Sequence, residues 1–168
     1  MSGFDFAIQD FRPGALGWVT QQHGAYYAQH WGFHPRFEIE VAREMAEFFG
    51  RFAPGIDGFW VAVRGEQILG SITIDGSGYP EQGARLRWFI LGEEARGLGI
   101  GRALMEHALG FCRQAGHGRV FLWTMAGLAA ARHLYDAYGF TLTEEVVDLD
   151  WGPDVRHQRM ALDLGTAE

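Results

Sequence analysis

Arg96-Gly97-Leu98-Gly99-Ile100-Gly101-Arg102 is the stretch of sequence that decides the fold. An apolar run that ends at Leu91 precedes it, and an amphipathic helical pattern follows it. Alternating glycines let the main chain adopt positive φ and approach a ligand closely, while the flanking arginines add positive charge. Free N–H groups at a helix N-terminus attract anions. The stretch therefore predicts a strand, loop and helix unit that binds phosphate, with the N–H groups of residues 98–102 facing the ligand.

Two other interpretations of this loop are open. A dinucleotide-binding fold uses a similar glycine pattern, but places it after the first strand and has Gly where this chain has Arg102. That fold also needs an acid near the end of the next strand, and the expected strand 119–124 ends without one. The other interpretation is a glycine-rich turn without a ligand. Three alternating glycines between two arginines would cost chain entropy on folding with no ligand contact to offset it.

The composition limits the class of protein. The chain has 168 residues, of which 48% are hydrophobic, and this predicts one packed domain over residues 1–168. The formal net charge of −7 argues against a broad nucleic-acid surface and is compatible with cationic amine substrates. The chain contains no Lys, which excludes a Schiff-base lysine and the lysine of nucleotide-triphosphatase loops.

Targeting and assembly signals are few. No stretch is long and apolar enough to cross a membrane, and the first five residues lack the segments of a secretory signal. We therefore expect a cytoplasmic protein that binds neither membrane nor nucleic acid. The single Cys and the His spacing offer no metal-ligand set, so no metal is expected. The many Phe and Trp residues of the expected helices suit a homodimer interface.

Hydrophobic periodicity and turn residues outline the other elements. Helices are expected over residues 16–30, 37–52, 100–115 and 128–138, and strands over residues 4–8, 59–63, 68–74, 84–91, 120–124, 141–149 and 155–164. Gly32 and Pro35 are expected to end the first helix, and Gly116 and Gly139 the last two. The order β-α-α-β-β-β-α-β-α-β-β predicts a mixed α/β (α+β) sheet.

The segment from Leu86 to Leu142 resembles the core of the GNAT family of N-acetyltransferases. The family hallmark, Arg or Gln followed by x-x-Gly-x-Gly or Ala, is matched by residues 96–101. A second match is Ala131-Arg132-His133-Leu134-Tyr135-Asp136-Ala137-Tyr138-Gly139-Phe140. The resemblance implies a mixed, mostly antiparallel sheet of six to seven strands flanked by about four helices, with acetyl-CoA as the acyl donor.

The resemblance extends to the acetyltransferase half found fused to winged-helix regulators of the multiple-antibiotic-resistance type. The matching residues are Arg12-Pro13-Gly14 to Gly17-Trp18-Val19, His23-Gly24, Tyr26-Tyr27-Ala28, Leu122-Trp123-Thr124 and Trp151-Gly152 to Gln158-Arg159. The acetyltransferase part fills the 168 residues, so we expect a stand-alone domain without operator-DNA binding.

The resemblance also implies a reaction and a cofactor site. Acetyl would pass from acetyl-CoA to a small-molecule or peptide amine by direct attack in a ternary complex. The loop residues Arg96, Gly97, Leu98, Gly99, Ile100, Gly101 and Arg102 would hold the pyrophosphate. The main chain of Phe89, Ile90 and Leu91 would pair with the pantetheine arm, with the Ile90 N–H on the thioester carbonyl. Trp123, Thr124 and Ala131 would lie beside the cofactor.

Tyr135 corresponds to the tyrosine of the second family motif. A phenol near the sulfur can donate a proton to the departing thiolate, so Tyr135 is the expected general acid. The alternative is a packing role, because an aromatic residue on an amphipathic helix is usually part of the core. Tyr138 is expected to pack. The alternative function for the whole chain is an acyl-CoA sensor or carrier without turnover.

The general base and the acceptor site are left open by the sequence. Relatives often carry Glu on the strand before the loop, where this chain has Arg85 and Arg87. A water relay to Glu81, Glu44 or His23 is compatible with the sequence. The acceptor pocket is expected to be walled by His23, Tyr26, Tyr27 and Trp31, with core packing as the alternative for each.

Overall fold

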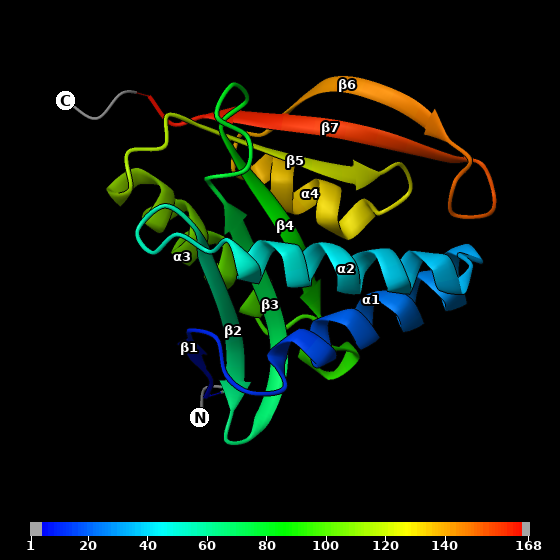
Figure 1. Cartoon of the computed structure of the whole chain (residues 1–168), viewed down its shortest axis with the longest axis horizontal. Helices are drawn as coiled ribbons and strands as arrows, with labels where there is room; N and C mark the ends of the chain where they lie inside the picture. The colour runs from blue at the N-terminus through cyan, green and yellow to red at the C-terminus, as the bar shows by residue number, and fades with distance from the viewer. Residues whose placement is uncertain (1–4, 166–168) are drawn as a thin grey trace.

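The computed structural model describes residues 5–165, and its elements follow the expected order (Figure 1). The strands are β1 (Ala7–Gln9), β2 (Gly58–Arg64), β3 (Gln67–Asp75), β4 (Ala84–Leu91), β5 (Arg119–Met125), β6 (Thr141–Asp148) and β7 (Val155–Asp163). The helices are α1 (Ala15–Trp31), α2 (Pro35–Gly50), α3 (Ile100–Gln114) and α4 (Ala129–Ala137), with a short 3₁₀ turn, η1 (Glu93–Ala95), before the glycine loop.

The sheet of the described residues has seven strands in the order β1-β2-β3-β4-β5-β7-β6. Neighbouring strands in this part of the chain pair antiparallel, except β4 and β5, which are parallel. The crossover between those two strands is α3, as a parallel connection requires. The predicted mixed, mostly antiparallel sheet with four flanking helices is therefore confirmed.

Helices cover both faces of the sheet, and the alternation along β2 shows how the sequence divides its apolar residues between them. Trp60 and Ala62 point into a core cluster with α3 residues such as Leu104. Phe59 and Val61 point to the opposite face and pack with residues of α1 and α2. Successive side chains of a strand face opposite sides, so one strand serves two cores. In Figure 1, α1 and α2 lie side by side across the front of the sheet.

A bulge turns β4 away from β5 near the middle of the sheet. Ser71 pairs with Ile90 and Thr73 with Arg87, so β4 has one more residue than β3 across this interval. Trp88 lies in the bulge with φ of 45°, an uncommon conformation for a bulky residue, and its carbonyl accepts a hydrogen bond of 2.9 Å from the Ser71 hydroxyl. Within residues 5–165, β4 and β5 pair at two positions, Ala84 with Val120 and Arg85 with Phe121, and then diverge (Figure 1).

The other side of the sheet ends in a long hairpin. β6 is the edge strand, and the side chains of residues 141–147 are exposed on both of its faces. β7 lies between β6 and β5, and its register places Asp148 opposite Val155, and Met125 opposite His157. The hairpin therefore places the end of β6 one strand away from the end of β5.

Three details of the sequence prediction are wrong. The first strand is Ala7–Gln9, whereas the prediction was 4–8, of which Phe4 lies outside the described residues. Pro35 does not end the first helix but begins the second, where its missing N–H costs no helical hydrogen bond. His30, expected on the continuous face of α1, is exposed. The helix ends at Gly32, Gly116 and Gly139 are confirmed, each with positive φ.

The helices of residues 5–165 are all too short or too polar to span a bilayer.

Candidate active site

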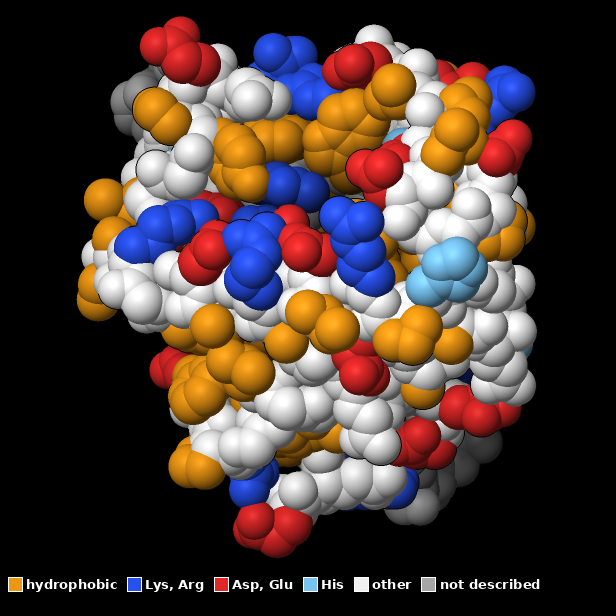
Figure 2. All heavy atoms as spheres, turned by 45° about the vertical axis from the view of Figure 1, so that its right-hand side comes forward, with side chains coloured by type: hydrophobic (Ala, Val, Ile, Leu, Met, Phe, Trp, Pro, Cys, Tyr) orange, Lys and Arg blue, Asp and Glu red, His pale blue; other side chains and the backbone are white. Residues whose placement is uncertain are grey.

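A chamber of about 920 Å³ opens where β4 and β5 diverge. The two strands form its middle, α4 and the start of α3 close one end, and α1, α2 and the β6–β7 hairpin surround the other. We call these the loop end and the acceptor end. In Figure 2 a hollow on this face lies above a row of acidic and basic side chains over α2, with apolar side chains along its opposite rim.

The glycine loop lies at the loop end. Gly97 and Gly99 have φ of 75° and 78°, and a Cβ on either would meet no atom within 4 Å. The space over the loop is therefore open to a ligand. Gly99 caps α3, and the Ala103 N–H is bonded to the Gly99 carbonyl at 3.1 Å, which leaves the N–H groups of residues 100–102 without partners inside the helix. A pyrophosphate fits this set of free N–H groups and positive charges.

Gly101, unlike Gly97 and Gly99, has close neighbours. A Cβ there would lie 3.3 Å from the Leu91 Cδ1 atom and 3.5 Å from the Phe89 Cζ atom. The first turn of α3 is therefore packed closely against the end of β4. Ile100, by contrast, turns a fully buried side chain into the core, so that only its main chain is available to a ligand.

The register of β4 determines which of its main-chain groups face the gap. The Gly92 N–H donates to the Leu69 carbonyl at 2.8 Å, and orientation alternates along an antiparallel pair. Ile90 therefore directs its main-chain groups toward β3, as Gly92 does. Phe89 and Leu91 have the opposite orientation, toward the space that β5 leaves.

Tyr135 is buried in the chamber wall. Its side chain comes from α4 and packs with the rings of Phe89 and Phe140, at centroid distances of 6.3 and 5.9 Å. Burial raises the pKa of the Tyr135 hydroxyl above that of a free phenol, and the nearby Tyr27 raises it further. Tyr135 is therefore protonated at neutral pH. Tyr138 packs on the same core from outside the chamber, and its hydroxyl donates to Glu106 at 2.9 Å.

Two arginines belong to the loop end. Both Arg96 and Arg102 are exposed, and Arg96 also lines the chamber. The Arg96 guanidinium lies 5.3 Å from the centre of the Tyr26 ring, and that of Arg102 lies 5.8 Å from the Tyr138 ring. Aromatic faces support these cations without neutralising them, so their charge remains available to an anion.

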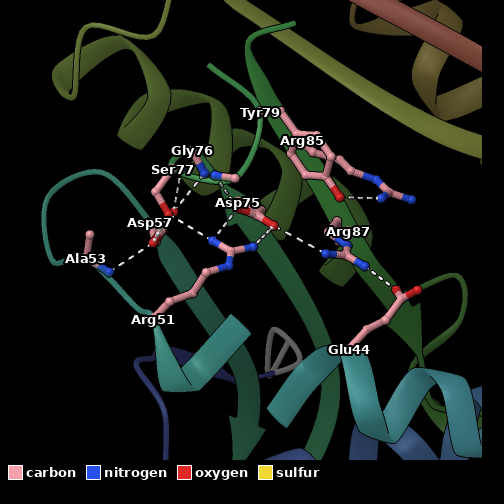
Figure 3. Close-up of polar contacts among 11 residues, drawn as sticks. Glu44, Arg51, Ala53, Asp57, Asp75, Gly76, Ser77, Tyr79, Arg85 and Arg87 are labelled. Carbon is pink, nitrogen blue, oxygen red and sulfur yellow. Dashed lines mark hydrogen bonds and ion pairs between the residues drawn. The ribbon is translucent and has the colours of Figure 1, made fainter. Parts of the chain in front are cut away.

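A chain of ion pairs holds one wall of the acceptor end (Figure 3). The buried carboxylate of Asp75 accepts from Arg51 at 2.6 and 3.0 Å and from Arg87 at 3.2 Å. Arg87 also donates to Glu44 of α2 and lies over the Trp88 ring at 4.2 Å. Burial alone would raise the pKa of Asp75, but the arginine contacts hold it below its usual value.

His23 of α1 is buried against the helix. Its Nδ1 atom lies 2.8 Å from the Val19 carbonyl oxygen, so Nδ1 carries the proton and Nε2 has the free lone pair. Burial lowers the pKa of His23 to about 4, and the hydrogen bond to the Val19 carbonyl offsets only part of this effect. The ring stacks on Tyr27 at 6.2 Å. His23 is therefore a neutral member of the acceptor end.

His157 and Asp148 meet at the end of the hairpin. The His157 Nε2 atom is 3.9 Å from the Asp148 Oδ2 atom, and both residues line the chamber. Among the buried side-chain nitrogen and oxygen atoms of residues 5–165, Thr73 Oγ1 and His157 Nε2 lack a hydrogen-bond partner. Burial lowers the pKa of His157, and the charge of Asp148 opposes that effect.

The structure brings most of the predicted site residues to one chamber. Its lining includes Phe89, Ile90, Leu91, Arg96, Gly101, Trp123, Thr124, Ala131, Tyr135, His23, Tyr26 and Tyr27. Outside the lining lie Gly97, Leu98, Gly99, Ile100, Arg102 and Trp31. Trp31 packs beside the chamber with Phe33 and Met125. This contact fits the alternative stated for Trp31, which was core packing.

Sequence reasoning missed several acceptor-end residues. Asp148, Asp150, Trp151 and His157 all line the chamber, and none was expected there. The expected hairpin was the signal that could have identified them. Two strands joined by a short turn bring together the residues on either side of that turn. Of the suggested proton relays, Glu44 and His23 line the chamber, whereas Glu81 is exposed in the loop after β3.

Comparison with known proteins gives a consistent set of relatives. The model of the Acetyltransferase (GNAT) family matches residues 22–140. A mycothiol acetyltransferase of Geodermatophilus obscurus is 34% identical over 98 residues, covering 56% of this chain and 31% of the relative. The mouse (Mus musculus) N-acetyltransferase 8 is 38% identical over 103 residues, which cover 58% of this chain and 45% of that relative. The chain spans between 29% and 48% of the length of the curated relatives it matches.

Solved structures share the fold. The yncA protein of Salmonella typhimurium, whose structure was determined with its cofactor acetyl-CoA, superposes with a TM-score of 0.76 at 16% identity. The superposition covers 98% of this chain and 96% of that one. At this identity the likeness is one of architecture.

Proposed function

This chain belongs to the acetyltransferase (GNAT) family, and we propose that it transfers acetyl from acetyl-CoA to an amine by direct attack in a ternary complex. The observation that carries the proposal is the single chamber that joins the glycine loop end to the acceptor end, with Tyr135 in its wall. An acyl donor and an acceptor entering from opposite ends would meet between β4 and β5. Such positioning removes most of the entropy cost of a two-substrate reaction.

The loop end would hold the donor. Residues 96–102 would bind the pyrophosphate through free N–H groups and through the charges of Arg96 and Arg102. The main-chain groups of Phe89 and Leu91, which face the gap, would pair with the pantetheine arm and stabilise the developing oxyanion. When bound, acetyl-CoA supplies the activated thioester. Trp123, Thr124 and Ala131 line the opposite side of this part of the chamber.

Tyr135 is the proposed general acid. Its raised pKa keeps the hydroxyl protonated, and its side chain lies in the chamber wall beside Phe89. The O–H group can therefore donate to the sulfur as negative charge develops on it.

The acceptor end suits an amine with a positive charge or an apolar body. Acidic side chains at the chamber include Glu44, Asp148 and Asp150, and aromatic rings include those of Tyr26, Tyr27, Phe37 and Trp151. Carboxylates attract a cationic substrate, and aromatic faces bind both its charge and its hydrocarbon. Small-molecule and peptide amines both meet this description.

The test is release of CoA thiol from acetyl-CoA in the presence of alkyl amines, diamines and a peptide with a free N-terminus. For Tyr135→Phe we expect kcat to fall by about 10²-fold, because the general acid is lost while packing is kept. Tyr138→Phe is the matched control and should keep the wild-type kcat, since the Tyr138 hydroxyl donates to Glu106 and to the Arg102 carbonyl outside the chamber, so that any effect should be confined to the KM for acetyl-CoA.

The same assay separates the enzyme from an acyl-CoA sensor. A binder without turnover would gain thermal stability from acetyl-CoA but release no thiol with any amine. An unchanged rate and pH profile in Tyr135→Phe would contradict the role of Tyr135 without contradicting the transfer itself.

A further inference from the structure

Acetyl transfer to an amine needs a group that removes a proton from the attacking nitrogen, and β4 carries no carboxylate. Glu44 lines the chamber, but its Oε2 atom accepts from Arg87, so this carboxylate is part of the ion-pair chain. Glu81 lies outside the chamber lining. The remaining candidates at the acceptor end are the histidines and the hairpin carboxylates Asp148 and Asp150, of which Asp148 lies against His157.

Of these histidines, His23 is the weaker base. The bond from Nδ1 to the Val19 carbonyl fixes its tautomer, and burial makes its protonated form strongly acidic, with a pKa of about 4. Efficient general bases have pKa values near the working pH. His23 therefore has little tendency to take a proton from an amine at neutral pH.

The sheet places the other histidine, His157, on the acceptor face. Val155 packs with Phe33 and Met125 on the side of α1 and α2, and His157, two residues along β7, points to the same side. Gln158 points the other way, where its Oε1 atom accepts from Arg132 of α4 at 3.2 Å. The two neighbouring side chains of β7 thus serve opposite faces of the sheet.

The two ring nitrogens of His157 differ. Nε2 is buried without a hydrogen-bond partner and is 3.9 Å from the Asp148 carboxylate. A small rotation would let Nε2–H donate to Asp148, and catalytic hydrogen bonds are often this long before substrate binds. Nδ1 is then the nitrogen with the free lone pair. An imidazole oriented by a carboxylate on its far side is the arrangement of a general base.

We infer that His157 accepts the proton of the attacking amine at Nδ1, with Asp148 as the residue that positions the ring through Nε2–H. This inference rests on the proposed function and names its base. Neither residue lies on β4 or in the glycine loop, so the base comes from the hairpin and the acid from α4.

The step balances with groups already named. The amine lone pair forms the C–N bond, and the C–S bond of the thioester breaks. One proton leaves the nitrogen for His157 Nδ1, and one passes from the Tyr135 hydroxyl to the sulfur. Solvent then carries the proton from His157 back to Tyr135, so the sum is amine plus thioester giving amide plus thiol.

Other titratable and charged groups face the same chamber and set the field around His157. They are Asp148 and Asp150 of the hairpin, His23, Tyr26 and Tyr27 of α1, Glu44 of α2, Arg85 and Arg87 of β4, Arg96 of the loop and Tyr135 of α4. Arg87 is neutralised by Asp75 and Glu44. Asp148 is therefore the charge that acts on His157 at the shortest separation the structure shows.

The first test is the pH dependence of thiol release, with the amine that gives the highest wild-type rate. Wild-type kcat/KM, divided by the fraction of the amine that is unprotonated at each pH, should rise with pH as His157 loses its proton. In His157→Gln, kcat should fall by about 10²-fold and this rise should disappear, while the KM for acetyl-CoA stays the same. His133→Gln, at an exposed histidine of α4 outside the chamber lining, is the control and should match the wild type.

The second test needs no turnover. The imidazole of His157 is titrated by NMR in the protein without substrate, in the wild type and in Asp148→Asn. Removing the carboxylate charge should lower the pKa of His157, and the rise of kcat/KM should move to lower pH with it. The NMR titration reports the charge of Asp148 on the ring, and an equal shift in the kcat/KM profile would show that His157 is the group that titrates in catalysis. Restoration of activity in His157→Ala by added imidazole guards against a loss caused by misfolding.

The outcomes are distinct. No thiol release by the wild type with any amine would overturn the proposed function, while the NMR titration would still report on the Asp148–His157 pair. An active wild type with the pH rise intact in His157→Gln, or lost in His23→Gln instead, would overturn the inference. The same holds if Asp148→Asn leaves the His157 titration unmoved.

Discussion

The loop end of the chamber and the acceptor end are built by different means. The loop end uses the main chain of one nearly continuous segment, residues 84–102, with its bulge, its positive-φ glycines and the start of α3. The acceptor end uses side chains from α1, α2 and the β6–β7 hairpin, which are more than a hundred residues apart at their extremes. The loop end, which is made of main chain, depends on local backbone conformation. The acceptor end, which is made of side chains, depends on the packing of distant elements and on ion pairs.

The buried ion pairs should give the largest effect, and they test the acceptor end. Asp75→Asn leaves Arg51 and Arg87 without their shared carboxylate, so we expect the free energy of unfolding in urea to fall by about 3–5 kcal/mol. Glu66→Gln, at a highly exposed partner of Arg12, is the control and should change nothing measurable. If Asp75→Asn weakens acetyl-CoA binding as strongly as it lowers stability, the two ends are not independent.

The pH dependence of stability should show the next largest effect. The pKa of His23 is about 4 in the folded chain and 6.5 in the unfolded chain, so the unfolded chain binds more protons between these values. The resulting stability is complete above pH 6.5 and is lost as the pH falls toward 4. At 1.36 kcal/mol per pKa unit, the free energy of unfolding should fall by about 3 kcal/mol over this range.

Urea unfolding from pH 7 to pH 4 measures this contribution of His23. The slope should flatten in His23→Gln and persist in His133→Gln. A slope that survives in both variants would locate the pH sensitivity elsewhere.

The smallest of these effects concerns the loop end. Gly99→Ala forces a side chain into the left-handed region, at a cost of about 1–2 kcal/mol in unfolding free energy. The KM for acetyl-CoA should rise while the KM for the amine stays constant. Gly110→Ala, inside α3 with open space around it, is the matched control and should stabilise the chain slightly. Equal changes in both KM values for Gly99→Ala would remove the distinction between the ends.

This contrast explains what the sequence could predict. The loop, β4 and the helix stops rest on glycine and on hydrophobic period, which are properties of neighbouring residues, and the structure has them where they were expected. The bulge at Trp88 was not predicted, because positive φ at a tryptophan is imposed by the pairing with β3 and has no residue signature.

The acceptor end was harder to predict for a related reason. His23 and the tyrosines of α1 could be named because they share a helix face with apolar residues. His157 could not be named, because its place in the chamber follows from its contact with Asp148 across the hairpin and from its pairing with Met125 of β5. Arg87 was noted as an obstacle to a β4 base, but its partners Asp75 and Glu44 come from elements whose contact only the fold determines.

The divergence of β4 and β5 has a consequence for motion. The halves of the sheet in residues 5–165, β1 to β4 and β5 to β6, share two paired positions at one end. Beyond that point the β4 and β5 amides that face the gap have no ladder partner. Each half should therefore open locally as its own cooperative unit, with hydrogen exchange fastest along the inner edges of the gap. A ligand that pairs with both edges would act as the strand that the sheet lacks and would join the two units into one.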